Sequence, residues 1–431
     1  MTPAARYKAI IDLVEQILNE DRPADGIVSL FFRDNRYMGS KDRAAVREGF
    51  YRILRHMNRL TWWIESQSYT PTPRTYVILD SIFRGEQTVE TLQKRIFNGD
   101  KYAPKPLSDA EIRLAEALSK KSMKDPSIPK RIALECPEWA WQPLCDAFGD
   151  DVDKQLEAMQ QKNDLHLRVN PIKAKYDDVF AALKKDGFAI EKGTLSPHCI
   201  RVKGRPAITQ HEKYRDGSFE IQNEGSQLIA LACNAKPGDR VVDFCAGAGG
   251  KTLALAAMME NKGAIIACDV LEGRLKRSKQ RFRRAGVHNI ETRPLTSERD
   301  PWVKRHKGKY DIVLTDAPCS GVGTWRGDPD KRWRQLGPGL SELVPLQAEI
   351  LDSAARLVKP GGRLVYGTCS LLPEENEDQV AKFIETHPEF EVVDMPEHVP
   401  ETVKSGQYMK ATPAEHDCDG FFAAVMRKKA D

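Results

Sequence analysis

The sequence predicts an α/β protein whose C-terminal half forms a parallel sheet with helices on both faces. Strand-like and helix-like segments alternate from about residue 231 onward. A glycine-rich run, DFCAGAGGKT, stands where the first of these strands meets the first helix. Residues 1–150 instead repeat their apolar side chains at helical spacing. Because 431 residues exceed one ordinary domain, we expect a helical domain (1–150), a small α/β module (151–232) and the main α/β domain (233–431).

Composition narrows the class of protein. The net charge is +4, from 66 basic and 62 acidic side chains, so only local clusters of charge carry information about partners. The longest apolar stretches, such as 253–259, are too short to cross a bilayer, and the N-terminus lacks the apolar run of a secretory signal. We therefore expect a cytoplasmic protein that does not bind a membrane. The nine cysteines form no CxxC pair, and we expect no metal site.

The predicted elements follow from the apolar pattern. The middle module is expected to contain helices at 152–161 and 176–185 and strands at 165–170, 188–191, 200–203 and 218–222. In the C-terminal domain we expect strands at 240–245, 264–269, 290–295, 310–316, 363–369, 390–395 and 421–426. The helices between them are expected at 250–259, 272–285, 341–358 and 374–386.

The glycine run predicts a cofactor loop. Glycines allow a ligand to approach the backbone, and the following helix N-terminus favours a negative group. A Walker phosphate loop needs glycine where Cys245 stands, and the dinucleotide pattern that begins at Gly247 ends on Thr252 instead of glycine. The remaining candidate is S-adenosylmethionine, with Asp269 placed at the next strand end to accept both ribose hydroxyls. The loop by itself leaves the identity of the cofactor open.

Two cysteine motifs stand at further strand ends. DAPCSG follows strand 310–316, and TCS ends strand 363–369. In the strand order usual for methyltransferases these strands are neighbours, so Cys319, Cys369 and the glycine loop are expected to share one cleft. A thiolate that adds to C6 of a pyrimidine makes C5 nucleophilic enough to accept a methyl group. Asp316 could then bind N3 or the exocyclic amine of cytosine.

These motifs resemble the Nop/Sun family of RNA cytosine-5 methyltransferases, and most closely its RsmB-like branch. The segments that carry the resemblance are DFCAGAGGKT, DAPCSGVGTWRGDPDKRW, GTCSLLPEENE, the final DGFF, LRVNP, FEIQNEGSQ and KDRAAVREGFYRILRHMNRL. The resemblance implies a Rossmann-like class I methyltransferase sheet, preceded by an all-α NusB-like domain and a small α/β module. It also implies methyl transfer from S-adenosylmethionine to C5 of a cytosine in RNA, most commonly 16S ribosomal RNA.

The resemblance also implies roles for individual residues. Cys369 matches the nucleophile, Cys319 the cysteine that assists product release, and Asp316 the acid that contacts cytosine and borders the cofactor. The implied cofactor contacts are Cys245, Ala246, Gly247, Ala248, Gly249, Gly250, Lys251, Asp269, Arg274 and Asp316. After the third strand the family carries an acid that contacts adenine, and here Thr296 and Asp300 are both candidates. The loop also departs from the family by carrying Gly247-Ala248 where Ala-Pro is usual.

Clusters of arginine are the candidates for contacts with RNA. We interpret the helix 272–285 mostly as a solvated charged face and favour the segment 325–334 beside the Cys319 motif, where arginine and tryptophan alternate. Further candidates are Arg43, Arg47, Arg55, Arg59, His166 and Arg168. The expected partner is ribosomal RNA or a partly assembled small subunit, bound by a monomer.

Two other functions remain open at this point. The first is a ribosome assembly factor that keeps the fold but not the activity. The second is a DNA cytosine methyltransferase, although those enzymes carry a Pro-Cys-Gln motif where this chain has Pro-Cys-Ser.

Overall fold

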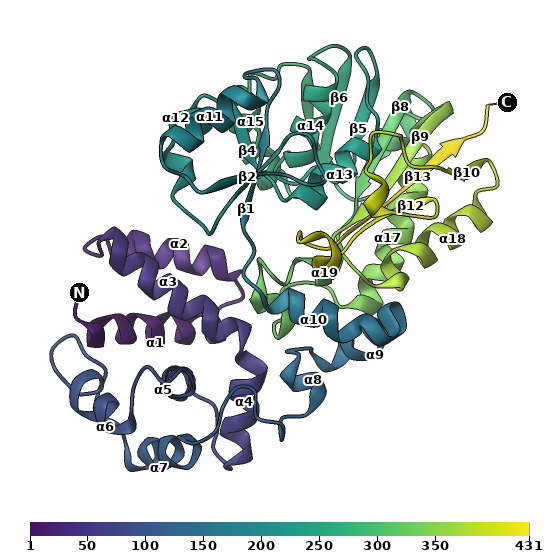
Figure 1. Ribbon diagram of the computed structural model, residues 1–431. Helices are drawn as coiled ribbons and strands as arrows, with labels where there is room; N and C mark the ends of the chain where they lie inside the picture. Colours follow the sequence, from purple (N-terminus) through teal and green to yellow (C-terminus); the bar gives the residue numbers. More distant parts are fainter. Residues whose placement is uncertain (431) are drawn as a thin grey trace. The chain divides into compact units, whose positions relative to one another are not determined.

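The computed structural model of the chain describes residues 1–430 and divides into two compact units (Figure 1). The first contains residues 1–160 together with 328–337, and the second contains 161–327 and the chain from 338 onward. None of the described helices combines the length and the apolar character that a membrane span requires.

The first unit is helical throughout. Its helices are α1 (Pro3–Asn19), α2 (Ala24–Asp34), α3 (Ser40–Arg55), α4 (Met57–Ser66), α5 (Pro73–Phe83), α6 (Val89–Thr91), η1 (Leu92–Ile96), α7 (Asp109–Leu118), α8 (Lys130–Ala133), α9 (Glu138–Phe148), η2 (Gly149–Asp151), α10 (Val152–Gln160) and η5 (Pro329–Arg332). Local capping explains several boundaries. The Thr2 side chain accepts from Ala5 N at the start of α1, and Ser108 and Glu111 form a capping box on α7.

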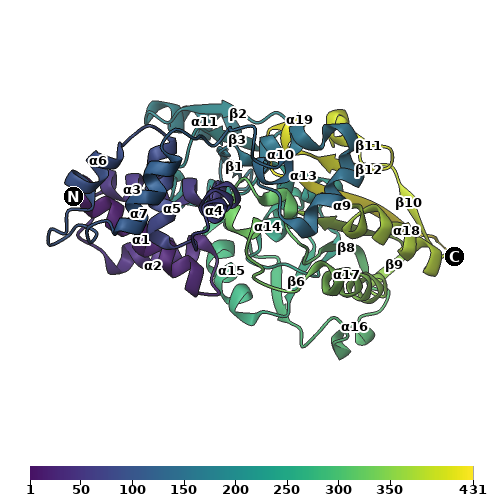
Figure 2. The same ribbon diagram turned by 90° about the horizontal axis from the view of Figure 1, so that it is seen from below.

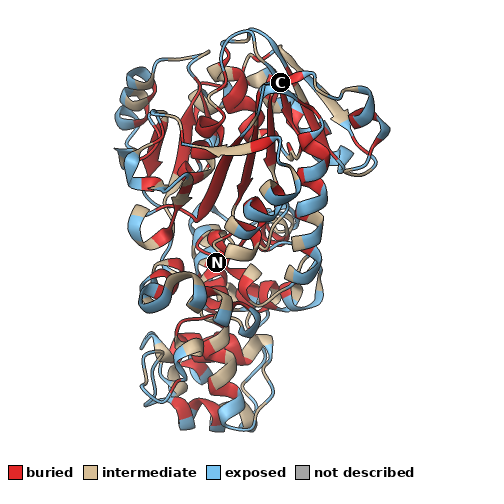
Figure 3. Ribbon diagram, turned by 90° about the vertical axis from the view of Figure 1, so that its right-hand side faces the viewer, coloured by how far each residue is buried: buried red, intermediate tan, exposed pale blue. Residues whose placement is uncertain are grey.

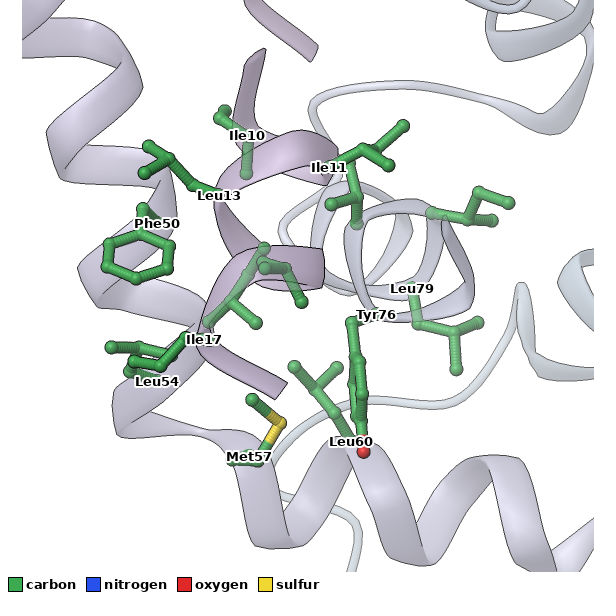
Figure 4. Packing of buried hydrophobic residues seen from close by; sticks show 14 of the residues in the cluster. Ile10, Ile11, Leu13, Ile17, Phe50, Leu54, Met57, Leu60, Tyr76 and Leu79 are labelled. Carbon is green, nitrogen blue, oxygen red and sulfur yellow. The ribbon is translucent and has the colours of Figure 1, made fainter. Parts of the chain in front are cut away.

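The core of this unit lies between α1, α3, α4 and α5. Leu13 and Ile17 of α1 are fully buried and point toward Phe50 and Leu54 of α3 (Figure 4). The apolar stripe of each amphipathic helix thus covers those of its neighbours, as helical periodicity requires. The predicted helical region is confirmed.

The second unit begins with a four-stranded antiparallel sheet in the order β2-β3-β1-β4. Its elements are β1 (Leu165–Val169), α11 (Tyr176–Lys185), β2 (Ile190–Lys192), β3 (Cys199–Val202), η3 (Ile208–Gln210), α12 (Glu212–Arg215) and β4 (Phe219–Ile221). Buried side chains from β1, β3, β4 and α11 form its core. The elements predicted for the middle module are all present within a few residues of their expected bounds.

A nine-stranded sheet follows, in the order β11-β12-β13-β9-β8-β5-β6-β7, with β10 paired to β13. The strands are β5 (Arg240–Asp243), β6 (Ala264–Asp269), β7 (Ile290–Pro294), β8 (Tyr310–Asp316), β9 (Val358–Thr368), β10 (Phe390–Val393), β11 (Lys404–Ser405), β12 (Tyr408–Ala411) and β13 (Phe421–Lys428). The five strands β5 to β9 are parallel, as predicted, and β9, β8 and β5 are neighbours.

The expectation of a wholly parallel sheet is wrong at one edge. There, β13 runs antiparallel to β9, and β10 and β12 run antiparallel to β13. Parallel neighbours need a crossover of about a dozen residues or more, and the connection between β12 and β13 is shorter than that. The strands β11 and β12 were also missed, because neither is long enough to show a clear alternation.

Helices cover both faces of the large sheet, and its central strands β5, β8 and β13 are mostly buried (Figure 3). The helices and helical turns of this part of the chain are α13 (Glu224–Ala232), α14 (Gly250–Met258), α15 (Glu272–Arg284), α16 (Pro301–Arg305), η4 (Val322–Thr324), α17 (Leu340–Ala355), η6 (Pro373–Glu375), α18 (Glu377–Thr386), η7 (Glu401–Val403) and α19 (Pro413–His416). Val241 and Val242 of β5 belong to different apolar clusters, one on each face. On one face α17 packs against β8, β9 and α18 (Figure 2).

Candidate active site

Two cysteines face each other at the carboxyl ends of β8 and β9. The Sγ atoms of Cys319 and Cys369 are 3.3 Å apart, and both side chains are partly exposed. Cys369 follows β9 directly, and Cys319 lies in the loop after β8, so the parallel pairing of the two strands brings together cysteines that are 50 residues apart in sequence. The remaining seven cysteines are free as well, and five of them are buried.

A charged pair lies at the same edge of the sheet. Lys251, in the first turn of α14, donates from Nζ to Asp316 Oδ2 at 2.7 Å. Burial by itself would lower the pKa of Lys251, but the carboxylate of Asp316, with Cys369 and Asp243 nearby, raises that pKa above its ordinary value. The lysine is therefore a fixed positive charge in the neighbourhood of the cysteines.

The cofactor loop has the backbone that its glycines predict. Gly249 adopts a left-handed conformation (φ +78°) directly before α14. A Cβ atom at this position would lie 2.5 Å from the Phe282 ring, so only glycine fits between the loop and α15. The predicted loop residues Cys245, Ala246, Ala248 and Gly250 complete this turn between β5 and α14.

Asp269 fixes the loop from the neighbouring strand. Its Oδ2 accepts from Gly247 N at 2.8 Å, and its Oδ1 accepts from Leu271 N at 2.7 Å. Each carboxylate oxygen has a second lone pair and could still accept a hydroxyl group. Asp269 thus holds the loop in shape and retains the capacity that the sequence analysis assigned to it.

A second acid, Asp243, is hydrogen-bonded to the first turn of α14. Asp243, at the end of β5, is buried and accepts from Thr252 Oγ1 at 2.6 Å through Oδ2. Its Oδ1 has no hydrogen-bond partner within residues 1–430. Burial raises the pKa of Asp243 to about 7.

Glu375 is a site residue that the sequence analysis missed. This fully buried carboxylate accepts from Ser320 N at 2.8 Å and from Ser320 Oγ at 2.5 Å, and it also accepts from Gln347 Nε2 at 3.0 Å. Gln347 in turn donates to Pro318 O at 2.9 Å. The loop of Cys319 is thereby tied to the helical turn that follows Cys369. The motif GTCSLLPEENE contained this glutamate, but nothing in the motif indicates that it is buried.

The same connection affects the Cys319 thiol. The pKa of Cys319 is raised well above its ordinary value by its contact with the Cys369 thiol, by burial, and by the negative charge of Glu375. Glu375 therefore favours a protonated Cys319.

A second set of hydrogen bonds holds the loop of Cys369. Thr368 Oγ1 donates to Asn376 Oδ1 at 2.6 Å, and Asn376 Nδ2 donates to Ser370 O at 3.1 Å. Gly323 N donates to Cys369 O at 3.0 Å, and a Cβ at Gly323 would lie 2.8 Å from that oxygen. Buried polar contacts thus hold both cysteine loops.

Two of the predicted cofactor residues lie outside this network. Arg274 is an exposed residue in the first turn of α15. Thr296 is also exposed, and both its backbone N and its Oγ1 donate to Asp300 Oδ2. Asp300 caps α16 by accepting from Trp302 N at 2.8 Å. The structure thus gives Asp300 a capping role, while the contacts of Arg274 and Thr296 with a cofactor stay predictions.

Three of the arginine and tryptophan residues in the segment predicted to contact RNA are buried. Trp325 and Arg332 are almost completely inaccessible, and Arg326 is 5% exposed and donates to Asp417 Oδ1 at 2.8 Å. Arg332 donates to Met159 O at 2.5 Å within the helical unit. The prediction of an RNA-contacting surface is wrong for these three residues, because all three side chains are buried and the two arginines donate to internal oxygens.

Other arginine and histidine candidates are buried as well. Arg59 donates to Glu135 at 2.8 Å inside the helical unit, and Arg55 is 8% exposed. Arg168 donates to Gly250 O at 2.7 Å and supports the first turn of α14. His166 Nδ1 accepts from Glu224 N at 3.0 Å. For His166 and Arg168 the structural role therefore holds.

His166 also belongs to a cluster of potential metal ligands with Cys199 and Glu224. The carboxylate of Glu224 already accepts from two backbone amides and forms a buried ion pair with Arg201 at 2.8 Å. The positive charge of Arg201 disfavours a cation at this position, so the cluster is a hydrogen-bonded core.

The sheet order, the glycine loop and the adjacent strand ends define a Rossmann-like methyltransferase fold. The family model described as "16S rRNA methyltransferase RsmB/F" matches residues 230–427. A model described as a ferredoxin-like domain of RsmF/B-like methyltransferases matches residues 136–209. The chain belongs to the RsmB/F family of 16S rRNA methyltransferases, which confirms the resemblance read from the motifs.

Individual relatives agree with this family. A Bacillus subtilis (strain 168) protein, named probable ribosomal RNA small subunit methyltransferase B, is 33% identical over 315 residues, which cover 70% of this chain and 68% of the relative. A Salmonella paratyphi B protein named ribosomal RNA small subunit methyltransferase B is 27% identical and covers 96% of this chain and 97% of its own. The crystal structure of PH0851 matches with a TM-score of 0.83 at 28% identity and covers 99% of both chains.

Proposed function

We propose that this RNA methyltransferase transfers a methyl group from S-adenosylmethionine to C5 of a cytosine in 16S ribosomal RNA, through a covalent bond between Cys369 and C6 of the base. The observation that carries the proposal is the pair of Cys319 and Cys369, with sulfur atoms 3.3 Å apart at the ends of adjacent strands. Membership of the RsmB/F family supports RNA as the substrate. The chemistry of the two thiols supports a pyrimidine C5 as the target.

The residues around the loop fit the cofactor. The glycine turn before α14 leaves the backbone open to close approach, and the helix N-terminus favours the carboxylate of the amino-acid portion. Asp269 holds the loop and keeps lone pairs for ribose hydroxyls. The proposed contacts are Cys245, Ala246, Gly247, Ala248, Gly249, Gly250, Lys251, Asp269, Arg274, Thr296 and Asp316. When bound there, S-adenosylmethionine would supply an electrophilic methyl group.

The covalent step accounts for the cysteine at the end of β9. The thiolate of Cys369 adds to C6 of cytosine, and the electron pair of the C5–C6 bond becomes available at C5. After C5 has gained the methyl group, a base removes the C5 proton, and the electron pair of the C5–H bond restores the double bond and expels the Cys369 thiolate. Asp316 would accept a hydrogen bond from the exocyclic amine, and the hydrogen bond from Lys251 Nζ orients its carboxylate.

The two thiols are assigned different roles in this scheme. Cys369 is the nucleophile, and Cys319 assists release of the methylated base. The environment of Cys319 supports this division, because contact with the Cys369 thiol, burial and the charge of Glu375 together raise the pKa of Cys319 and favour a neutral thiol there.

The experiment compares two single substitutions in a methyl-transfer assay with labelled cofactor and 16S rRNA. Cys369→Ala should abolish both methylation and the protein–RNA adduct. Cys319→Ala should slow release, so that a covalent adduct accumulates and is visible on a denaturing gel. An adduct with Cys369→Ala would reverse the assignment. Absence of label from every cytosine in wild-type reactions would instead favour a non-catalytic assembly factor.

The setting of the reaction is proposed on the same basis. We propose that the substrate is ribosomal RNA or a partly assembled small subunit, and that the protein acts as a cytoplasmic monomer. We also retain the three-part division into residues 1–150, 151–232 and 233–431 as a proposal, with RNA docking as the role of the first part. Bisulfite mapping of RNA from cells with and without the gene would identify the modified cytosine.

A further inference from the structure

The net positive charge of the chain depends on one helix. The helix α15, with the sequence EGRLKRSKQRFRR, carries seven basic side chains and one acidic side chain. The whole chain carries 66 basic and 62 acidic side chains. Without α15 it would carry 59 and 61, a net charge of −2 in place of +4. A helix of thirteen residues therefore decides the sign of the net charge.

One face of α15 is committed to the fold. Leu275, Ser278 and Phe282 are buried, and Phe282 lies against Gly249 of the cofactor loop. Arg281 donates to Ala248 O of the same loop at 2.7 Å and also to Glu220. The helix is thus packed directly on the loop proposed to hold the cofactor.

Glu220 forms ion pairs with the basic side chains on the packed side of α15. Its buried carboxylate accepts from both Arg281 and Arg284. Two of the seven basic side chains are therefore structural. The other five are exposed: Arg274, Lys276, Arg277, Lys279 and Arg283.

The exposed basic face is almost without counter-charge. Within residues 1–430, the single ion pair of these five side chains joins Lys276 to Glu272 at 3.1 Å. Lys279 and Arg283 are four residues apart, and Arg274 and Arg277 are three apart, so like charges lie side by side on the helix surface. Arg274 also lies in the first turn, where the helix dipole disfavours a cation. This distribution does not serve the stability of the helix, and a bound polyanion would compensate it.

We propose that the exposed face of α15 is the surface along which the phosphate backbone of the substrate RNA lies on its way to the two cysteines. The inference rests on the proposed function, because it names the surface that presents RNA to that site. The helix begins just after Asp269 and packs on the cofactor loop, so a strand bound along it is led to the edge of the sheet where Cys319 and Cys369 lie. Arginine and lysine along one face match phosphates and carry no base specificity.

The test measures the salt dependence of RNA binding by the full chain without cofactor, with in-vitro transcribed 16S rRNA as the probe. The double variant Arg277→Gln/Lys279→Gln removes two exposed charges. The matched control Lys184→Gln/Lys185→Gln removes two exposed charges from α11 of the same unit. Loss of two phosphate contacts should reduce the magnitude of the negative slope of log K against log salt by about 1.4 to 1.8. The control should keep the wild-type slope.

Two results would overturn the proposal: an unchanged slope in the α15 variant, or an equal decrease in the control. Equal thermal midpoints of both variants and the wild type exclude unfolding as the cause. In the methylation assay the α15 variant should raise KM for RNA several-fold and leave kcat unchanged. If no cytosine is methylated while the salt dependence of the α15 variant is still weaker, the proposed function is wrong and the RNA-binding surface is supported. If cytosine is methylated while the salt dependence is unchanged, the proposed function is supported and the RNA-binding surface is wrong.

Discussion

Two arginine-rich segments, the helix α15 and the chain from Trp325 to Arg334, look alike in composition and differ in their environment. Arg332 is 1% exposed, and burial lowers its pKa to about 10. By contrast, Arg277 and Arg283 of α15 are exposed. In the segment from Trp325 to Arg334, Arg326 and Arg332 donate to internal carboxylate and carbonyl oxygens. The helix α15 leaves most of its charge exposed to solvent. Composition therefore indicates that charge is present, but not whether a partner can reach it.

The largest expected effect comes from the buried member of the comparison. Arg332→Ala should destabilise the protein by about 3–5 kcal/mol, because Met159 O loses its donor and a cavity forms in the helical unit. Chemical denaturation measures this change. Lys331→Ala, at the neighbouring and more exposed position, is the control and should change the unfolding free energy by less than about 0.5 kcal/mol. If the Arg332→Ala variant is as stable as the wild type but binds RNA weakly, Arg332 contacts RNA and the structural role is wrong.

Burial of an acid, Asp243, should make the stability of the protein depend on pH. The pKa of Asp243 rises from its ordinary 3.8 to about 7 in the folded protein. Between these values the unfolded chain is ionised while the folded chain keeps the proton, so stability falls as the pH rises from about 4 to 7 and then levels off.

Asp243→Asn should abolish this slope and make the variant more stable than the wild type at pH 8, by about 2–4 kcal/mol. Asn keeps an oxygen that can accept from Thr252. Denaturation curves at pH 5 and pH 8 provide the measurement, and parallel pH profiles of the two proteins would contradict the assignment.

Adjacent residues of α15 repeat the comparison within a single helix. Arg284→Ala should cost about 1–3 kcal/mol, because the buried Glu220 loses one of its two cationic partners. Arg283→Ala should be close to neutral in stability. Thermal unfolding of the two variants side by side tests this, and equal losses would show that exposure does not separate these residues.

The smallest expected effect on stability belongs to the exposed face. Lys279→Ala should change the unfolding free energy by no more than about 0.5 kcal/mol, since its charge has no ion-pair partner within residues 1–430. Its consequence should instead be a weaker salt dependence of RNA binding, as measured by filter binding. A clear loss of stability would indicate that the face has a structural role.

Much of the fold could be predicted from local patterns. The bounds of β6 and β8 agree with their predicted ranges, because each is a short apolar run closed by an aspartate. The glycine loop was recognised because Gly249 must adopt a conformation that other residues avoid. The antiparallel edge was not predicted, since the direction of β13 depends on its partner β9, more than fifty residues earlier in the chain.

The sequence by itself determined the alternation of strands and helices, the cofactor loop and the presence of two cysteine motifs, because these follow from nearest-neighbour conformational preferences. Only the tertiary structure decided that the sulfur atoms of Cys319 and Cys369 lie 3.3 Å apart and that Glu375 is hydrogen-bonded to the loop of Cys319. It also decided which arginine side chains are exposed to solvent. The reason is burial. Whether a charge is exposed depends on segments such as Met159 and Arg332, which are 173 residues apart and meet only when the chain folds.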